Sequence, residues 1–168
     1  MRNDNAKWDV PELAIAHEVG GVTITTAPVA RQTLVSGPSV LTQIRHPLVR
    51  WPDVAVNEVY ALALRRDRIL IVNGPEMTEG WDDIKAQAVS NASDAYHVID
   101  LTGEKAFDVL KRGSDARLDT PSGSVARLCF GLGVFLYRCG TKQTFRLHVS
   151  SAHADAMVKS LKHAALAV

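Results

Sequence analysis

The stretch "HVIDLTGEKAFDVLKRGS", residues 97–114, decides the fold class of this chain, because it joins a strand signal directly to a helix signal. Residues 97–101 form a largely apolar run of strand length, which predicts a β-strand. Gly103 then allows a tight turn, and the apolar spacing of the residues after it predicts a helix over 104–112. Units of this kind either hold a phosphate or cofactor or serve as scaffold, and the residues at the turn separate the two interpretations.

The turn of this unit lacks the features of a phosphate site. A P-loop needs GxxxxGK[ST] and a Rossmann turn needs GxGxxG, so that backbone N–H groups can surround the phosphates, and neither pattern is present. Glu104 would also place a negative charge beside an anion bound at the first helical turn. We expect Thr102 to cap the helix and Gly113 to end it, which makes the unit scaffold. The "GLG" at 131–133 has no helix after it and is interpreted as a hairpin turn.

A β-hairpin is predicted upstream of this unit. "VYALAL" (59–64) and "ILIVNGP" (69–75) are apolar runs that flank the charged turn "RRDR". The unbroken apolar stretch Ile69–Val72 predicts a strand that is covered on both faces. A helix is expected to follow over about 78–89, because Trp81 and Ile84 stand at helical spacing.

The remaining signals are strands, short loops and a closing helix. In "TFRLHVS" (144–150), Phe145, Leu147 and Val149 alternate with Thr144, Arg146 and His148, which predicts a strand with two different faces. The other expected elements are strands at 21–27 and 31–37, a short helix with Val40, Leu41 and Ile44, a loop at 46–54, two strands within 124–139, and a last helix that starts near Ser150 or Ser151, either of which can cap it.

These elements predict an α+β fold with a largely antiparallel sheet and helices packed on it. The order strand, polar break, helix occurs at "LALRRDRILIVNGPEMTEGWDDI" and again at "LHVSSAHADAMVKSL", which is typical of a pseudo-repeated βαβ-type domain. We expect residues 1–20 to be a partly flexible N-terminal arm and residues 21–168 to form a single domain.

Composition narrows the function classes. The chain has 168 residues, a formal net charge of +1 and 46% hydrophobic residues, so we expect a soluble folded protein with no nucleic-acid partner. The first residues contain no long apolar run, so neither a signal peptide nor a membrane span is predicted. Cys129 and Cys139 are the only cysteines, which predicts reduced thiols and a cytoplasmic location.

No catalytic, cofactor-binding or metal-ligating residues are predicted in this chain. The six histidines do not pair as HxxxH or stand beside CxxC, and GxSxG is absent. Asp108 stands at ion-pair spacing from Lys111 and is interpreted as a surface residue. Such a chain is often a subunit or a binding module. Aromatic residues outside the predicted core stripes are therefore candidates for contact with a partner, and these are Trp8, Trp51 and Tyr137.

Several stretches, in the same order and spacing, resemble a known family. These are "RQTLVSG" (31–37), "LALRRDRILIVNGP" (62–75), the block 90–119, "SGSVARLCF" (122–130) and the closing segment 144–165. Together they resemble the gamma subunit of heterotetrameric sarcosine oxidase, a family related to the folate-binding aminomethyltransferase fold. The family's GPDEW is "RRDRI" here with Asp67 kept, and its KGC cysteine is Ser114.

The resemblance implies a role without chemistry for this chain. Such complexes oxidatively demethylate sarcosine or another N-methyl amino acid and pass the one-carbon unit to tetrahydrofolate. The partner subunits carry FAD, FMN, NAD, tetrahydrofolate and zinc, and the gamma subunit packs chiefly against the alpha subunit in an assembly that also contains beta and delta. Two alternatives stay open: a free-standing folate-binding or aminomethyltransferase-like protein, and a structural interaction module of another complex.

Overall fold

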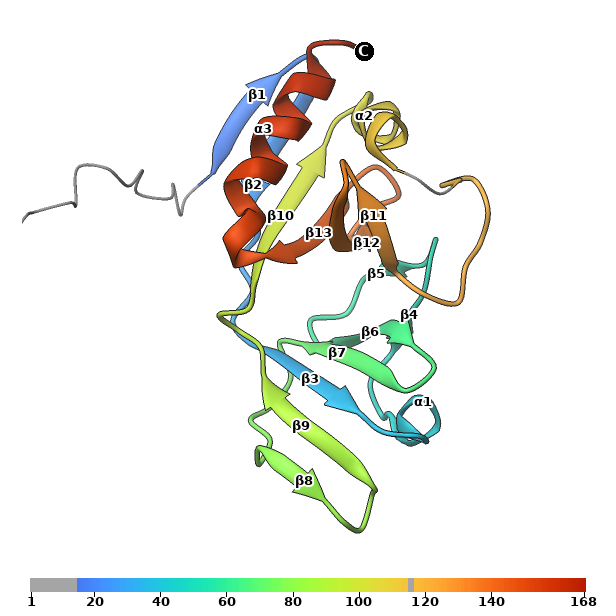
Figure 1. The fold of residues 1–168 in the computed structure, drawn as a ribbon. Helices are drawn as coiled ribbons and strands as arrows, with labels where there is room; N and C mark the ends of the chain where they lie inside the picture. The colour runs from blue at the N-terminus through green and yellow to red at the C-terminus, as the bar shows by residue number, and fades with distance from the viewer. Residues whose placement is uncertain (1–14, 115–116) are drawn as a thin grey trace, which may run out of the picture.

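The computed structural model describes residues 15–114 and 117–168, and in it the chain forms two β-sheets that pack against each other (Figure 1). The pairing is antiparallel except where β5 meets β12 and β4 meets β6. The prediction of an α+β fold with largely antiparallel pairing is confirmed.

Sheet A is the seven-stranded sheet, and sheet B is the six-stranded one. Sheet A has the order β1 (Ala16–Val19), β2 (Val22–Thr26), β10 (Tyr96–Thr102), β13 (Phe145–Ser150), β12 (Leu132–Cys139) and β11 (Ala126–Cys129), with β5 (Val54–Ala55) beside β12. Sheet B has the order β4 (Leu48–Val49), β6 (Tyr60–Arg65), β7 (Arg68–Val72), β3 (Gln32–Ser36), β9 (Gln87–Asn91) and β8 (Gly80–Asp82).

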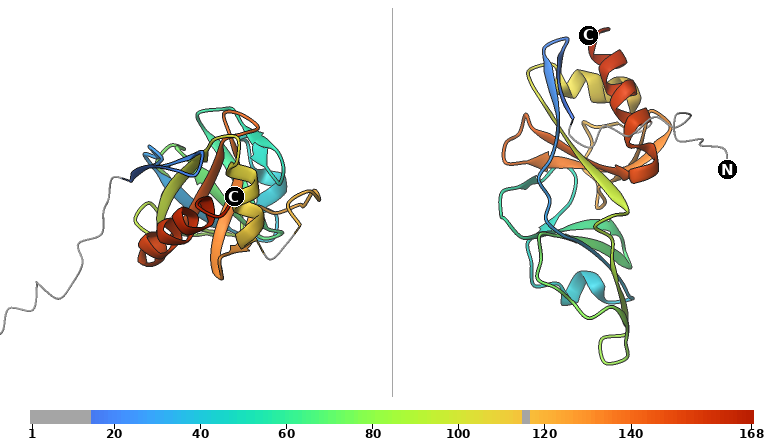
Figure 2. Two further views of the ribbon diagram at one scale, coloured as in Figure 1. Left: turned by 90° about the horizontal axis from the view of Figure 1, so that it is seen from above. Right: turned by 90° about the vertical axis from the view of Figure 1, so that its left-hand side faces the viewer.

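The helices lie on the outer faces of the two sheets. The helices α2 (Ala106–Gly113) and α3 (Ala154–Ala165) contact each other and cover sheet A, and a short 3-10 turn, Ser151–His153, leads into α3 (Figure 2). The one-turn helix α1 (Val40–Gln43) lies on sheet B beside β7. Apolar side chains therefore form three layers: one between sheet A and its helices, one between the sheets, and one on the outer face of sheet B.

The opening unit is scaffold for a specific geometric reason. Strand β10 and helix α2 form as predicted, and the helix ends at Gly113. Gly103 has a φ of +120°, and a Cβ there would lie 2.4 Å from the carbonyl oxygen of Gly21. Glycine is thus needed for close packing against the β1–β2 turn rather than for a phosphate. The expected cap is wrong, because the N-cap position is Lys105 and no side chain caps the helix.

The predicted helix at 78–89 is wrong, because this segment forms the β8–β9 hairpin. The carboxylate of Asp82 accepts hydrogen bonds from the backbone N–H groups of Ile84 and Lys85, at 3.0 and 3.1 Å, which closes a turn instead of a helix. Ala86 has a positive φ of 49°. The apparent strand, break, helix repeat depended on this helix, so its first copy is absent.

Smaller corrections concern boundaries and caps. Strand β1 begins at Ala16 and pairs with β2, within the range expected for the N-terminal arm. The loop expected at 46–54 contains β4 and the first residue of β5. No serine side chain caps α3, whose N-cap is His153, because Ser151 donates its hydroxyl to the carbonyl of Asp94. The hairpin turn expected at 131–133 lies one residue earlier, at Phe130 and Gly131, so Cys129 pairs with Leu132.

Candidate functional site

A cluster of polar side chains is buried between the two sheets. Sheet A supplies Asp100 from β10, Tyr137 from β12, and Arg146 and His148 from β13, and sheet B supplies Gln32 from β3 and Tyr60 from β6. We call these six residues the inter-sheet network. His148 and Tyr137 are both 0% exposed, so the network has the burial expected of a catalytic centre as well as that of a structural core.

The hydrogen bonds of the network have one consistent direction. The Gln32 Nε2 group donates to the carbonyls of Ser93 and Tyr96, so its Oε1 atom must accept. This oxygen lies 2.6 Å from Nδ1 of His148, which therefore carries the proton of the neutral ring. Nε2 of His148 then accepts from the Tyr137 hydroxyl at 2.9 Å.

The chain continues into sheet B and returns to sheet A. With the Tyr137 proton directed to His148, its oxygen accepts from the Tyr60 hydroxyl, 2.7 Å away. The Tyr60 oxygen in turn accepts from Nη1 of Arg146 at 3.4 Å. Arg146 also donates two hydrogen bonds of 2.7 Å to the carboxylate of Asp100, on the neighbouring strand. Every member therefore has a partner, which is what a buried polar group requires.

The electrostatics keep the aromatic members neutral. Burial, and then the positive charge of Arg146, lowers the pKa of His148 to about 3. Burial raises the pKa of Tyr60 and raises that of Tyr137 well above its usual value. Burial also raises the pKa of the neighbouring Cys139 thiol. Burial alone would lower the pKa of Arg146, but its hydrogen bonds to Asp100, together with its charge interactions with Tyr137, Asp100 and Cys139, outweigh this effect and raise it.

This arrangement is suited to holding the sheets together and poorly suited to catalysis. A general base works best with a pKa near the operating pH, and the pKa of His148 lies far below neutral pH. A tyrosine or thiol nucleophile needs a lowered pKa, whereas those of Tyr137 and Cys139 are raised. The only charged groups, Asp100 and Arg146, neutralise each other. We therefore interpret the inter-sheet network as structural.

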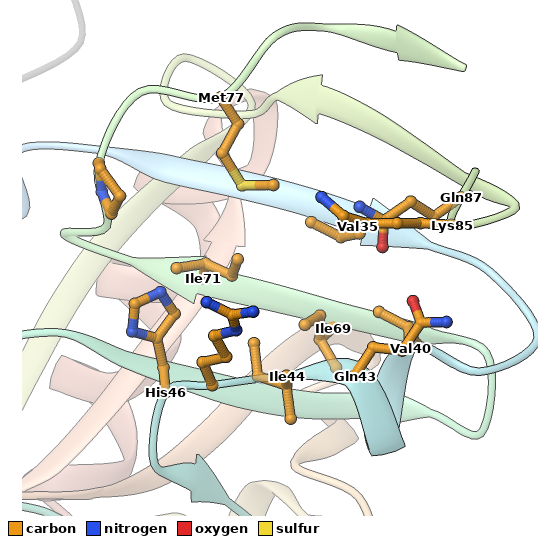
Figure 3. A pocket seen from close by; sticks show the side chains of 12 residues that line it. Val35, Val40, Gln43, Ile44, His46, Ile69, Ile71, Met77, Lys85 and Gln87 are labelled. Atoms are coloured by element: carbon orange, nitrogen blue, oxygen red, sulfur yellow. The ribbon is translucent and has the colours of Figure 1, made fainter. Parts of the chain in front are cut away.

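A pocket of about 530 Å³ opens on the outer face of sheet B (Figure 3). Its floor is formed by apolar side chains of β3 and β7, and its walls come from the segment around α1 on one side and from residues 75–77 and 85–87 on the other. We call this the outer pocket. Its lining residues are Val35, Val40, Gln43, Ile44, Arg45, His46, Ile69, Ile71, Pro75, Met77, Lys85 and Gln87.

The β8–β9 hairpin beside this pocket carries large apolar side chains into solvent. Ile84 is 97% exposed and Trp81 is 62% exposed. In Figure 1 the hairpin projects from the end of the molecule opposite the C-terminus. Exposed large apolar side chains on a projecting hairpin are typical of a protein–protein contact.

The predicted contact residues are corrected by their burial. Trp51 is 2% exposed and donates from its ring nitrogen to the carbonyl of Leu118 at 3.0 Å. Tyr137 belongs to the inter-sheet network, and Trp8 lies outside the described residues. Neither Trp51 nor Tyr137 is therefore available on the surface. Sequence reasoning missed the network itself, although polar residues on a strictly alternating strand, such as Arg146 and His148, were a usable signal.

Within residues 15–114 and 117–168, no group of three or more His, Cys, Asp or Glu side chains could hold a metal ion. Cys129 is buried and Cys139 is half-buried, and no disulfide joins the two, as predicted. In the same part of the chain, no helix is long and apolar enough to cross a membrane.

Comparison with known proteins identifies the fold. No protein-family profile and no curated protein sequence matches this chain. Among solved structures, a chain of the heterotetrameric sarcosine oxidase from Corynebacterium sp. U-96, in complex with pyrrole 2-carboxylate, is similar to it with a TM-score of 0.66 and 18% sequence identity. The alignment covers 91% of this chain and 87% of that chain, so the two chains have nearly the same length and share one fold.

Proposed function

We propose that this chain is a non-catalytic subunit, of the gamma type, in a cytoplasmic, sarcosine-oxidase-like flavoenzyme complex. In this proposal the alpha, beta and delta partners carry FAD, FMN, NAD, tetrahydrofolate and zinc. The complex oxidises sarcosine or another N-methyl amino acid and passes the one-carbon unit to tetrahydrofolate. The folate-binding aminomethyltransferase-like topology and the single-domain organisation belong to the same proposal.

The observation that supports this proposal most is the coverage of the structural match. Because the alignment spans 87% of the neighbour chain, the similarity is to a whole small chain of that heterotetrameric enzyme and not to part of a large one. The chemistry agrees, since the buried titratable groups are held in unreactive forms. The exposed Trp81 and Ile84 agree as well, because a chain separated from its partners should present apolar surface.

The proposal is tested by co-expressing the tagged chain with candidate flavoprotein chains of a sarcosine-oxidase-like complex from the same genome. We expect a complex that co-elutes on size exclusion and carries flavin absorbance and N-methyl amino acid oxidation. Replacing Ile84 with Ser should weaken the complex if the β8–β9 hairpin is a contact. Leu166→Ser is the matched control, since Leu166 is also exposed, at 74%, but lies two residues from the C-terminus, which Figure 1 shows at the end of the molecule opposite the β8–β9 hairpin. A stable monomer that never co-elutes with flavoprotein chains would contradict the proposal.

The free-standing folate-binding alternative is less well supported. A pterin ring is gripped by a carboxylate, and none of the residues that line the outer pocket is acidic. Calorimetric titration of the isolated chain with tetrahydrofolate separates the alternatives, because sub-millimolar binding would favour the folate role over the subunit role.

A further inference from the structure

The outer pocket combines an apolar interior with polar ends. Figure 3 shows Ile44, Ile69 and Ile71 along its middle, with His46 toward one end and Gln43, Lys85 and Gln87 toward the other. A volume of about 530 Å³ is within the range of pockets that hold small organic ligands. A small molecule with an apolar body would therefore be buried against the isoleucines.

The charge of the lining has one sign. The cations Arg45 and Lys85 line the pocket, and no aspartate or glutamate does. Lys85 lies 3.5 Å from the carboxylate of Asp82, which partly neutralises it. Arg45 has no ion pair within residues 15–114 and 117–168. The guanidinium of Arg45 is thus the cation best placed to receive an anionic group, since arginine recognises carboxylates with two parallel hydrogen bonds.

Gln87 adds a polar group at the same end of the pocket as Lys85. Its side-chain amide makes no hydrogen bond to any described part of the chain, and its nitrogen and oxygen still reach solvent although the whole residue is only 6% exposed. Because the side chain lines the outer pocket, a bound molecule can replace the water on this amide and bond to it directly. The inter-sheet network shows the contrast, because its amide, Gln32, has all of its polar atoms bonded.

We propose that the outer pocket binds a small amphipathic carboxylate, with its apolar body on Ile69 and Ile71, its carboxylate on Arg45, and a polar group on the amide of Gln87. This inference does not depend on the proposed function, because it concerns the chain alone. It is a binding proposal and includes no chemical step.

The test uses the full-length chain and a matched pair of probes, 2-naphthaleneacetate and 2-naphthaleneacetamide, which differ only in charge. Binding is followed by calorimetry and by backbone amide NMR shifts. We expect the carboxylate to bind more tightly than the amide and to shift residues 43–46 and 85–87. Losing one charge-assisted contact in Arg45→Gln should weaken carboxylate binding about tenfold and amide binding less than about twofold.

Two further variants keep the test interpretable. Arg66→Gln removes an exposed cation from the β6–β7 turn, outside the pocket, and should leave binding unchanged. Ile44→Glu places a negative charge on the apolar wall and should abolish carboxylate binding, while circular dichroism checks that the fold is kept. The proposal is overturned if neither probe binds at millimolar concentration, if both bind equally, or if Arg45→Gln and Arg66→Gln have the same effect.

Discussion

The two faces of sheet B carry the same kinds of side chain under opposite conditions. On β7, Leu70 and Val72 pack inward against sheet A, while Ile69 and Ile71 point outward beneath α1. The inner face brings Gln32 to partners for all its polar atoms, whereas on the outer face the amide of Gln87 has no partner in the described chain and reaches solvent. The inner face is therefore completed by the chain itself, and the outer face leaves bonds and apolar area for something else.

The comparison has an energetic consequence. Side chains of the inter-sheet network should matter for stability and not for binding, because their partners are internal. Side chains at the rim of the outer face should matter for binding and little for stability. Substitutions on the two faces can therefore separate what folds the chain from what it binds.

The largest effect is expected at the ion pair of the inter-sheet network. Asp100→Ala leaves the guanidinium of Arg146, whose side chain is 12% exposed, without its anionic partner. Breaking a largely buried pair in this way should reduce the free energy of unfolding by about 3 kcal/mol in urea denaturation. The matched control is Asp119→Ala, which breaks the exposed pair with Arg117 and should change little. Equal effects of the two substitutions on the free energy of unfolding would show that the buried ion pair of the network contributes no more to stability than an exposed one.

The next largest effect is a dependence of stability on pH. The folded chain keeps His148 neutral down to a pKa of about 3, whereas the unfolded chain binds a proton near the ordinary value. Stability is then complete above the unfolded pKa and falls as the pH decreases toward the folded pKa. The slope is about 1.4 kcal/mol per pH unit, or about 2 kcal/mol between pH 6.5 and pH 5.

Denaturation curves at several pH values measure this slope. Burial also lowers the pKa of His97, so a part of the slope should remain in His148→Gln. Exposed His153→Gln is the control and should keep the whole slope. If His148→Gln does not fold, the ring of His148 can be titrated by NMR in the parent chain. A titration midpoint of His148 between pH 5 and pH 8 would refute the closed network.

A smaller effect is expected from one hydroxyl of the network. Tyr137→Phe removes the donor to His148 and the acceptor for Tyr60 while keeping the ring. Two buried polar atoms lose a partner, which should lower stability by about 1.5 kcal/mol in thermal or urea unfolding. Tyr96→Phe is the control, because Tyr96 packs its ring on Phe135 and no hydrogen bond of its hydroxyl lies within the described residues. A similar loss in both variants would mean that the hydroxyl bonds contribute nothing.

The same comparison explains what the sequence could and could not predict. Local signals identified the β6–β7 hairpin, the β10–α2 unit and the two-faced strand β13, because apolar periodicity determines which side chains lie together. Periodicity also predicted correctly that Ile69–Val72 is covered on both faces, since α1 and sheet A lie on opposite sides of β7. These are the parts of the fold decided by neighbours in sequence.

The remainder required contacts between distant segments. Alternation in β13 assigns Arg146 and His148 to one face but does not reveal that sheet B covers it, so a buried network is indistinguishable from a polar surface. Tyr137 was predicted to contact a partner, although it is buried in the network, for the same reason. The helix expected around Trp81 failed because Asp82 bonds the backbone of its own turn, a local competition that apolar spacing does not register.

The smallest effect on stability is expected at the rim of the outer face, and it sharpens the comparison most directly. Ile84 is 97% exposed, so Ile84→Ser removes little buried area and should change the free energy of unfolding by less than about 0.5 kcal/mol. Ile71→Ser, at a position 4% exposed on the same face, should cost several times more. If Ile84→Ser destabilised the chain as much as Ile71→Ser, the side chain would serve the fold. If Ile84→Ser leaves the free energy of unfolding unchanged but weakens co-elution with flavoprotein chains, the side chain of Ile84 serves the contact with a partner. Its apolar surface then contributes free energy when it is buried against that partner and not when the chain folds.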